Sequence, residues 1–389
     1  MRLISVLDIE PNMVLGKSIF SKNNKLLLGA GFRITPDFKG KLTDRGYNHV
    51  YVMEEGTDDV IPEDIISHEI KQQAQNKLHD AADQITSLLK VQGLSRNKLY
   101  DLIQSGYLKD FDITYDMKKI ASDILDDMMK ATLLNSLMFK TKKSYYMDHA
   151  LNTTVISILL GKKYRFTKDE LMSLAVGTFL HDFGKIIIER LAEAQQKSAD
   201  ELMREHPTFG YLLIQKSSGS TPMICQIINQ HHEQQDGNGY PIGLTGENLP
   251  PITNINIQRN ARGSIFRLAE ICSVADAYDN LVMNPTKEKQ LSPGEAIKIL
   301  IEKSGSVYNK HIVGTLTKIV PIFPVGAMVK IIHILDPALI GYSAVIAKVN
   351  EEHLDRPVII LLYDRSKRRV KPRIIDTSKL QKVNLELVI

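Results

Sequence analysis

The chain has 389 residues, more than one typical domain needs, so we expect two or three domains. Its 43% hydrophobic and 24% charged residues are ordinary for a globular protein, and a net charge of +4 is too small to indicate binding of nucleic acid polymers. We find no run of about 18 apolar residues and no signal-peptide order at the N-terminus, so we expect no membrane insertion and a cytoplasmic location.

Residues 1–60 alternate short apolar segments with turns and include one helical stretch, TPDFKGKLTDRG. This pattern predicts a small N-terminal α/β module. Residues 61–115 are predicted as a helical linker. Between Pro62 and Lys90 its apolar residues have the spacing of an amphipathic helix, and the resulting stripe either pairs with a second copy in a homodimer or packs on the same chain. A further helix is expected at Met117–Met138.

Three motifs between residues 181 and 241 carry most of the information about function: HDFGK, HPTFG and HHEQQDGNGYP. Imidazoles and carboxylates are the usual ligands of zinc, manganese, iron and nickel, and two such ions can clamp both oxygens of an in-line phosphoryl displacement. An isolated His-Asp step is more often a helix-terminal hydrogen bond. The neighbouring motifs favour a metal-dependent hydrolase instead.

These motifs resemble the HD-GYP family, a branch of the HD phosphohydrolase superfamily whose members hydrolyse cyclic di-GMP. The resemblance covers roughly residues 145–320 and implies an all-α catalytic domain, which we place at 116–320. It also implies two or three metal ions, usually iron or manganese, and a cut that gives pGpG, GMP or both. Carried over to this sequence, the metal ligands are His149, His181, Asp182, His206, His231, His232 and Asp276. The family's loop signature falls on Asp236, Gly237, Gly239, Tyr240 and Pro241, and its motif lysine is Lys185.

The expected mechanism follows from these residue types. Asp182 bridges two ions; His181, Asp276 and His149 hold one of them, and His206, His231 and His232 hold the other. A water between the ions is the expected nucleophile. Lys185 either places its charge against the phosphate, as a catalytic and substrate-binding group, or is a solvated lysine.

The DGNGYP loop is expected to shape the site rather than to react, with Tyr240 in a structural role. Glu233 and Asp236 either fix imidazole tautomers or lie in solvent.

This sequence departs from the family's pattern in three places, and these differences limit what the resemblance implies. Where family members with three metals have a glutamate, this chain has Tyr145, so we expect two divalent transition metal ions. An insertion near residues 253–264 carries Arg259 and Arg262, which could touch phosphate or belong to a solvated loop. After Asp279 the family's first arginine is missing, and only Lys287 falls near the second, where it could bind substrate as a point charge.

Residues 321–389 have period-two alternation and β-branched residues, which predict a C-terminal β module. Its basic run at 365–373 either meets an anionic partner or protects a sheet edge. The sequence therefore predicts a metal-dependent phosphodiesterase acting on cyclic di-GMP. One alternative is a hydrolase of another cyclic dinucleotide or a nucleotide phosphate. The other is a catalytically weak, nucleotide-sensing scaffold.

Overall fold

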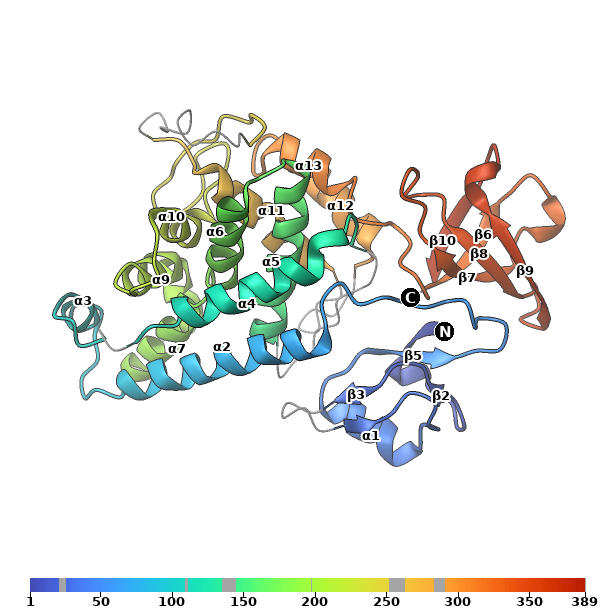
Figure 1. Cartoon of the computed structure of the whole chain (residues 1–389), viewed down its shortest axis with the longest axis horizontal. Coiled ribbons are helices and arrows are strands. Elements are labelled where there is room, and N and C mark those ends of the chain that lie inside the picture. The colour runs from blue at the N-terminus through green and yellow to red at the C-terminus, as the bar shows by residue number, and fades with distance from the viewer. Residues whose placement is uncertain are drawn as a thin grey trace.

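The computed structural model describes residues 1–20, 26–108, 111–134, 145–196, 198–251, 263–282 and 291–388. Figure 1 shows a helical region on one side and two small regions containing strands on the other, one from each end of the chain. The predicted fold class is confirmed in its coarser form, a helical region with strand-containing segments on either side of it in the chain.

The N-terminal region is built on a three-stranded antiparallel sheet in the order β1-β5-β2, with β1 at Arg2–Ser5, β5 at His49–Met53 and β2 at Val14–Leu15. Strands β3 (Ile19–Phe20) and β4 (Leu26–Leu28) pair with each other. Helix α1 (Pro36–Asp44) begins where the Thr35 side chain accepts a hydrogen bond from the backbone of Phe38. Alternating side chains such as Ile4, Val50 and Val52 form the core of this region.

The helical region contains twelve described α-helices that share one hydrophobic cluster. They are α2 (His68–Leu88), α3 (Arg96–Gln104), α4 (Thr114–Asp127), α5 (Tyr145–Lys163), α6 (Lys168–Phe179), α7 (Gly184–Gln195), α8 (Ala199–Leu202), α9 (His206–Ile214), α10 (Pro222–Gln230), α11 (Arg267–Leu281), α12 (Pro293–Glu302) and α13 (Lys310–Leu316). Helix α5 is buried along almost its whole length, and it packs against α6 and α11 at the centre.

Two predicted helices can be compared with the structure. The amphipathic stripe of α2, with Ala74, Leu78, Ala81 and Ile85, is buried against α4, α5 and α7 of the same chain, which favours the intrachain alternative. A homodimer stays a prediction. The helix predicted at Met117–Met138 begins earlier, at Thr114, and ends at Asp127, where a short 3-10 turn follows.

The C-terminal region is a five-stranded antiparallel sheet in the order β10-β6-β7-β8-β9. Its strands are β6 (Met328–His333), β7 (Ser343–Lys348), β8 (Val358–Tyr363), β9 (Arg369–Asp376) and β10 (Asn384–Val388). Much of the basic run forms β9, an edge strand that contains Pro372, as the edge-protecting alternative predicts. One of its arginines, Arg369, pairs with Glu54 of the N-terminal region at 2.7 Å.

Contacts between the regions bear on the predicted domain boundaries. Residues from the predicted linker, among them Leu78 and Ile103, lie in the same hydrophobic cluster as the helices that follow. The segment 61–115 therefore packs as part of the helical region. The boundaries at 60, 115 and 320 stay predictions.

One described stretch, Lys168–Gln195, is long and apolar enough to cross a membrane by length and composition. It comprises α6, α7 and the turn between them, and 72% of its most apolar window is buried inside the protein. Burial against neighbouring helices accounts for its apolar character. The cytoplasmic location stays a prediction.

Candidate metal centre

The His181-Asp182 step lies in the turn between α6 and α7, in the middle of the helical region. Gly184 opens α7 directly against the start of α9, and a Cβ at this position would overlap the carbonyl oxygen of His206. The glycine therefore allows the two helix starts to approach closely. This approach brings the Asp182 carboxylate to the ring of His206.

Seven side chains predicted as ligands converge here and form two groups. Within each group, all ligand atoms lie within 4.8 Å of one another. We call His149, His181 and Asp276 the core group, and Asp182, His206, His231 and His232 the junction group. These are the two sets expected from the sequence. Within the described residues, no other cluster of this kind is found.

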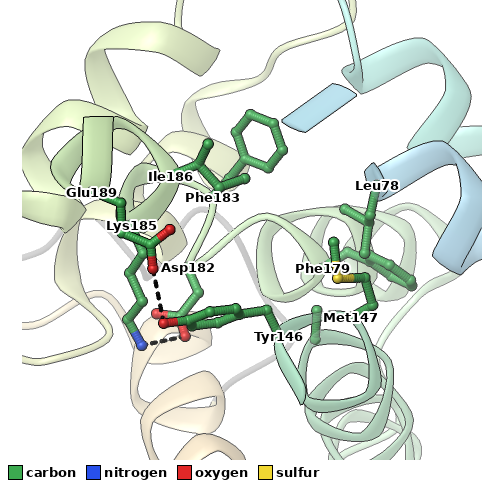
Figure 2. A pocket seen from close by; sticks show the side chains of 10 residues that line it. Leu78, Tyr146, Met147, Phe179, Asp182, Phe183, Lys185, Ile186 and Glu189 are labelled. Atoms are coloured by element: carbon green, nitrogen blue, oxygen red, sulfur yellow. Dashed lines mark hydrogen bonds and ion pairs between the residues drawn. The ribbon is translucent and has the colours of Figure 1, made fainter. Parts of the chain in front are cut away.

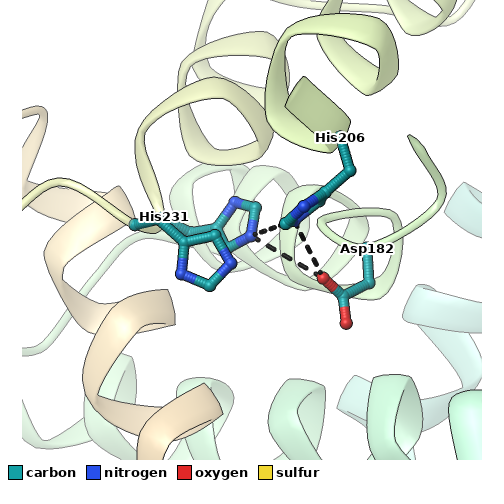
Figure 3. A group of neighbouring side chains, drawn as sticks. Asp182, His206 and His231 are labelled. Atoms are coloured by element: carbon teal, nitrogen blue, oxygen red, sulfur yellow. Dashed lines mark hydrogen bonds and ion pairs between the residues drawn. The ribbon is translucent and has the colours of Figure 1, made fainter. Parts of the chain in front are cut away.

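Asp182 directs its two carboxylate oxygens to different groups. Oδ1 lies 3.2 Å from Nε2 of His206 and 3.8 Å from Nε2 of His231, as Figure 3 shows. Oδ2 lies 3.6 Å from Nε2 of both His149 and His181 in the core group. A carboxylate in this position can bridge two cations.

Hydrogen bonds to the backbone set the tautomers of three histidines. Nδ1–H of His181, His206 and His231 donates to the carbonyl three residues earlier, at 2.6, 2.7 and 2.8 Å. Nε2 of each ring then carries a lone pair and faces the centre.

The acceptors in the centre provide a test of whether a metal fits. Nε2 of His206 and Nε2 of His231 lie 3.2 Å apart, although neither has a proton to share in these tautomers. Nε2 of His181 and Oδ1 of Asp182 are buried, and neither has a hydrogen-bond donor among the described residues. Because facing lone pairs repel unless a cation lies between them, the donor set fits metal ions.

The fourth ring, His149, is fixed by a side chain. Its Nδ1 is 2.7 Å from Oδ2 of Asp279, and Oδ1 of Asp279 accepts a hydrogen bond from Asn152. Asp279 was not predicted as a site residue. Its position one helical turn after Asp276 on α11 is the signal that could have revealed it.

The electrostatics of the centre favour bound cations. Burial alone would raise the pKa of Asp182, but Lys185 and His181 hold it well below its usual range. Burial lowers the pKa of His231 to about 4, so this ring is neutral near pH 7. Burial would also lower the pKa of His149, but Asp276 and Asp279 raise it to about 9. A proton or a metal ion is thus attracted to the core group.

Lys185 lies beside the centre, and Nζ of its side chain pairs with Oδ2 of Asp182. Burial would lower its pKa, yet Asp182 and Asp276 raise it, so the ammonium stays charged. Figure 2 shows this pair among the side chains that line a pocket next to α5 and α7. The contact with Asp182 disfavours the alternative of a freely solvated lysine.

The DGNGYP loop follows α10 and packs against the junction group. Tyr240 stacks on His232 with 4.6 Å between ring centroids, and the guanidinium of Arg204 lies over the Tyr240 ring, 4.8 Å from its centroid. Gly239 has no room for a Cβ, which would lie 2.6 Å from the carbonyl oxygen of His232, and Gly237 has a φ of +81°. The Tyr240–Pro241 peptide bond is cis.

The two loop carboxylates differ: Glu233 fits neither expected role, whereas Asp236 lies in solvent, one of the two alternatives. Glu233 neither fixes a tautomer nor lies in solvent: it is buried and accepts backbone hydrogen bonds from Ile242, Gly243 and Leu244. It therefore holds the loop in shape. Asp236 is exposed and accepts a hydrogen bond from the backbone of Asn238, as in a local turn.

Some predicted positions lie outside the described residues, namely Arg259, Arg262 and Lys287. Their contact with phosphate stays a prediction. Tyr145, which stands in place of a glutamate, donates a hydrogen bond to Asn280 at 2.7 Å and stacks on His149. It contributes a ring and a hydroxyl beside the core group, and no carboxylate.

Comparison with known families finds a match for the segment that contains this centre. Residues 146–281 match the model of the HD domain. This segment of the chain is similar to the HD domain. All seven predicted ligands and Asp279 lie within the matched residues. The resemblance found in the sequence is thereby confirmed for the HD domain.

Several curated proteins are similar to this chain. A cyclic di-GMP phosphodiesterase of Pseudomonas aeruginosa is 24% identical over 269 residues, which cover 67% of this chain and 59% of that protein. A cyclic di-GMP phosphodiesterase of Borreliella burgdorferi is 24% identical over 196 residues, 49% of this chain and 47% of that protein. The chain thus spans about half the length of these relatives.

Two further proteins were also found. A 3'3'-cGAMP-specific phosphodiesterase of Vibrio cholerae is 21% identical over 180 residues, 45% of this chain and 38% of that protein. Among solved structures, an HDG"Y"P protein of Bdellovibrio bacteriovorus matches with a TM-score of 0.43 and 19% identity, over 82% of this chain and 98% of that chain.

Proposed function

We propose that this chain is a metal-dependent phosphodiesterase that hydrolyses cyclic di-GMP to pGpG, GMP or both. The observation that carries the proposal is the position of Asp182, whose two oxygens face two separate groups of ligand atoms. We assign one divalent transition metal ion, iron or manganese, to each group. When bound, such ions lower the pKa of water and neutralise charge that develops on a phosphodiester.

The chain's own residues have defined tasks in this proposal. Asp182 lies between the two groups and fixes their separation. Backbone carbonyls and Asp279 hold the ring nitrogens toward the centre, so the ligands are arranged before substrate arrives. Lys185 stays cationic beside Asp182, where it can bind an oxygen of the phosphodiester.

The substrate is proposed from the relatives together with the centre. Two of the similar proteins are cyclic di-GMP phosphodiesterases that share the HD-domain segment with this chain. A second candidate substrate is 3'3'-cGAMP, because a phosphodiesterase specific for it is also similar. Both substrates have the same phosphodiester linkage next to a purine, and the same centre could cut either.

The test is anaerobic purification with metal quantification, followed by incubation with cyclic di-GMP and chromatography of the products, with and without added iron or manganese. We expect about two metal equivalents and metal-dependent formation of pGpG or GMP. His181→Ala should reduce hydrolysis by orders of magnitude, because it removes a ligand that faces both Asp182 and Asp276. The control is His79→Ala, since His79 lies on α2 with 58% of its side chain exposed.

A metal-loaded protein that leaves cyclic di-GMP whole but cuts 3'3'-cGAMP would establish the second candidate instead. Binding of either nucleotide without hydrolysis in the metal-loaded protein would support the sensing scaffold. Unchanged turnover in His181→Ala would overturn the assignment of the centre.

A further inference from the structure

A pocket next to the metal centre has no part in the mechanism above. It is partly open to solvent and lies among α2, α5, α6 and α7 (Figure 2). Its walls are apolar and include Leu78, Met147, Phe179, Phe183 and Ile186. Mostly apolar walls with a few polar groups are typical of small-molecule sites.

The polar groups of the pocket are of two kinds. Asp182 and Lys185 belong to the centre, so anything that fills the pocket lies beside the reacting phosphodiester. Tyr146 and Glu189 are the other polar residues, and they are joined by a hydrogen bond of 3.0 Å from the tyrosine hydroxyl to Oε1. Both residues are exposed, Tyr146 to 46%, so a ligand can reach them from solvent.

The state of this pair leaves an acceptor for a ligand. Burial and the nearby Glu189 carboxylate raise the pKa of Tyr146 to about 12, so the phenol keeps its proton and donates it to Oε1. A carboxylate that accepts this one hydrogen bond has further lone pairs, which a ligand can use. An ionised carboxylate accepts hydrogen bonds and donates none.

We propose that this pocket takes a purine base of the substrate and that Glu189 makes it selective for guanine over adenine. The inference rests on the proposed function and specifies which base that site accepts. Guanine presents N1–H and the N2 amino group side by side, and a carboxylate can accept from both. Adenine presents the N1 lone pair, which a carboxylate repels. The apolar walls and the Tyr146 ring provide surfaces for the flat base.

The experiment measures binding of GMP and AMP to the metal-loaded full chain by calorimetry. The wild type is expected to bind GMP at least about tenfold more tightly than AMP, as expected for a charged acceptor that pairs with only one of two bases. Glu189→Gln should reduce this preference by about tenfold, because the amide offers a donor where guanine also has donors. Its metal content is measured in parallel.

Glu193→Gln is the matched control. Glu193 lies one turn further along α7, 71% exposed and paired with Arg190, and it does not line the pocket. This variant should keep the wild-type preference. Equal affinity of the wild type for GMP and AMP would overturn the inference, as would an unchanged preference in Glu189→Gln.

Hydrolysis assays separate this inference from the proposed function. The ratio of kcat/KM for cyclic di-GMP to that for cyclic di-AMP should fall in Glu189→Gln through KM. The metal-loaded wild type could cut no cyclic dinucleotide while its GMP preference still depends on Glu189. That result would contradict the proposed phosphodiesterase function and support the guanine pocket. If hydrolysis occurs and Glu189→Gln keeps the guanine preference, the proposed phosphodiesterase function is supported and the guanine pocket is contradicted.

Discussion

The core group and the junction group differ in what holds them in place. In the core group, His181 is oriented by the backbone carbonyl of Thr178, but His149 depends on a side chain, Asp279, which lies on the same helix as the ligand Asp276. In the junction group, His206 and His231 depend on backbone carbonyls of their own helical turns. The position of His206 further depends on the contact between α7 and α9 at Gly184.

Because of this difference, the two halves of one centre should respond to different changes. A substitution of the single carboxylate Asp279 can perturb the core group without moving a helix. The junction group should respond to changes in helix packing, since backbone carbonyls orient His206 and His231 and the contact at Gly184 sets the position of His206. Asp182 contacts both halves, one with each carboxylate oxygen.

The largest effect is expected from Asp182→Asn. The amide has nearly the same shape as the carboxylate but loses the charge and one of the two oxygens that face the groups. Hydrolysis should fall well beyond the roughly 10- to 100-fold that is usual for supporting residues, and both metal equivalents should bind more weakly. Metal quantification and product chromatography measure this. Full loading with both ions would contradict the bridging position.

Gly184→Ala should act on the junction group. The added Cβ would overlap the carbonyl oxygen of His206 and must push α7 and α9 apart. A shift of about 1 Å in this group could reduce hydrolysis about a hundredfold, and the overpacking should cost about 1–3 kcal/mol of stability. One metal equivalent should weaken more than the other. Gly40→Ala is the control, because a Cβ there meets nothing within 4 Å.

Asp279→Asn should act on the core group with a smaller effect. The neutral amide in place of the carboxylate would no longer favour a positive charge on His149, and metal affinity or activity should fall roughly 10- to 100-fold. Chelator competition should show that a single equivalent is affected and that it differs from the one weakened in Gly184→Ala. Identical loss of both equivalents in the two variants would show that the groups are not independently supported.

Sequence reasoning predicted the ligands better than it predicted their supports. The seven ligand side chains stand out because their residue types are chemically distinctive and occur in short motifs, and the structure gathers all of them. The tautomer-setting contacts are mostly with backbone carbonyls, such as those of Met203 and Ile228, and carbonyls leave no signature in a sequence. Glu233 was singled out, yet its partners are backbone amides that only the folded loop defines.

The fold, like the metal centre, has parts that the sequence predicts and parts that only the packing of the folded chain defines. Period-two and helical patterns located the strands of both small modules and the helix α2, since these patterns follow from which face is buried. The end of α4 was placed too late, because Met128 continues the apolar pattern into a turn of different geometry. The pocket at Tyr146 and Glu189 could not be seen at all, as its residues come from four helices that only packing brings together.

The smallest effect on hydrolysis is expected from Glu270→Gln, which probes a connection between the two halves. Glu270 lies on α11, the helix of Asp276, and accepts hydrogen bonds from Gln235, which follows the junction group, and from Asn309. Burial raises the pKa of Glu270 to about 7 from 4.5, although both hydrogen bonds oppose this. The folded protein therefore binds a proton that the unfolded chain releases between about pH 4.5 and pH 7.

The consequence is a loss of stability as pH rises through that window, because the folded state must either keep the proton or bury the charge. Glu270→Gln removes the titration, so the unfolding free energy of the variant minus that of the wild type should increase from about pH 4.5 to about pH 8, by up to about 3 kcal/mol. Urea denaturation of both metal-free proteins at the two pH values measures this difference, in which other titrating groups cancel. A difference that does not change with pH would mean that Gln235 and Asn309 keep Glu270 ionised in the fold. In that case the two halves of the centre would be joined by a charged hydrogen-bond network rather than by a protonated carboxyl group.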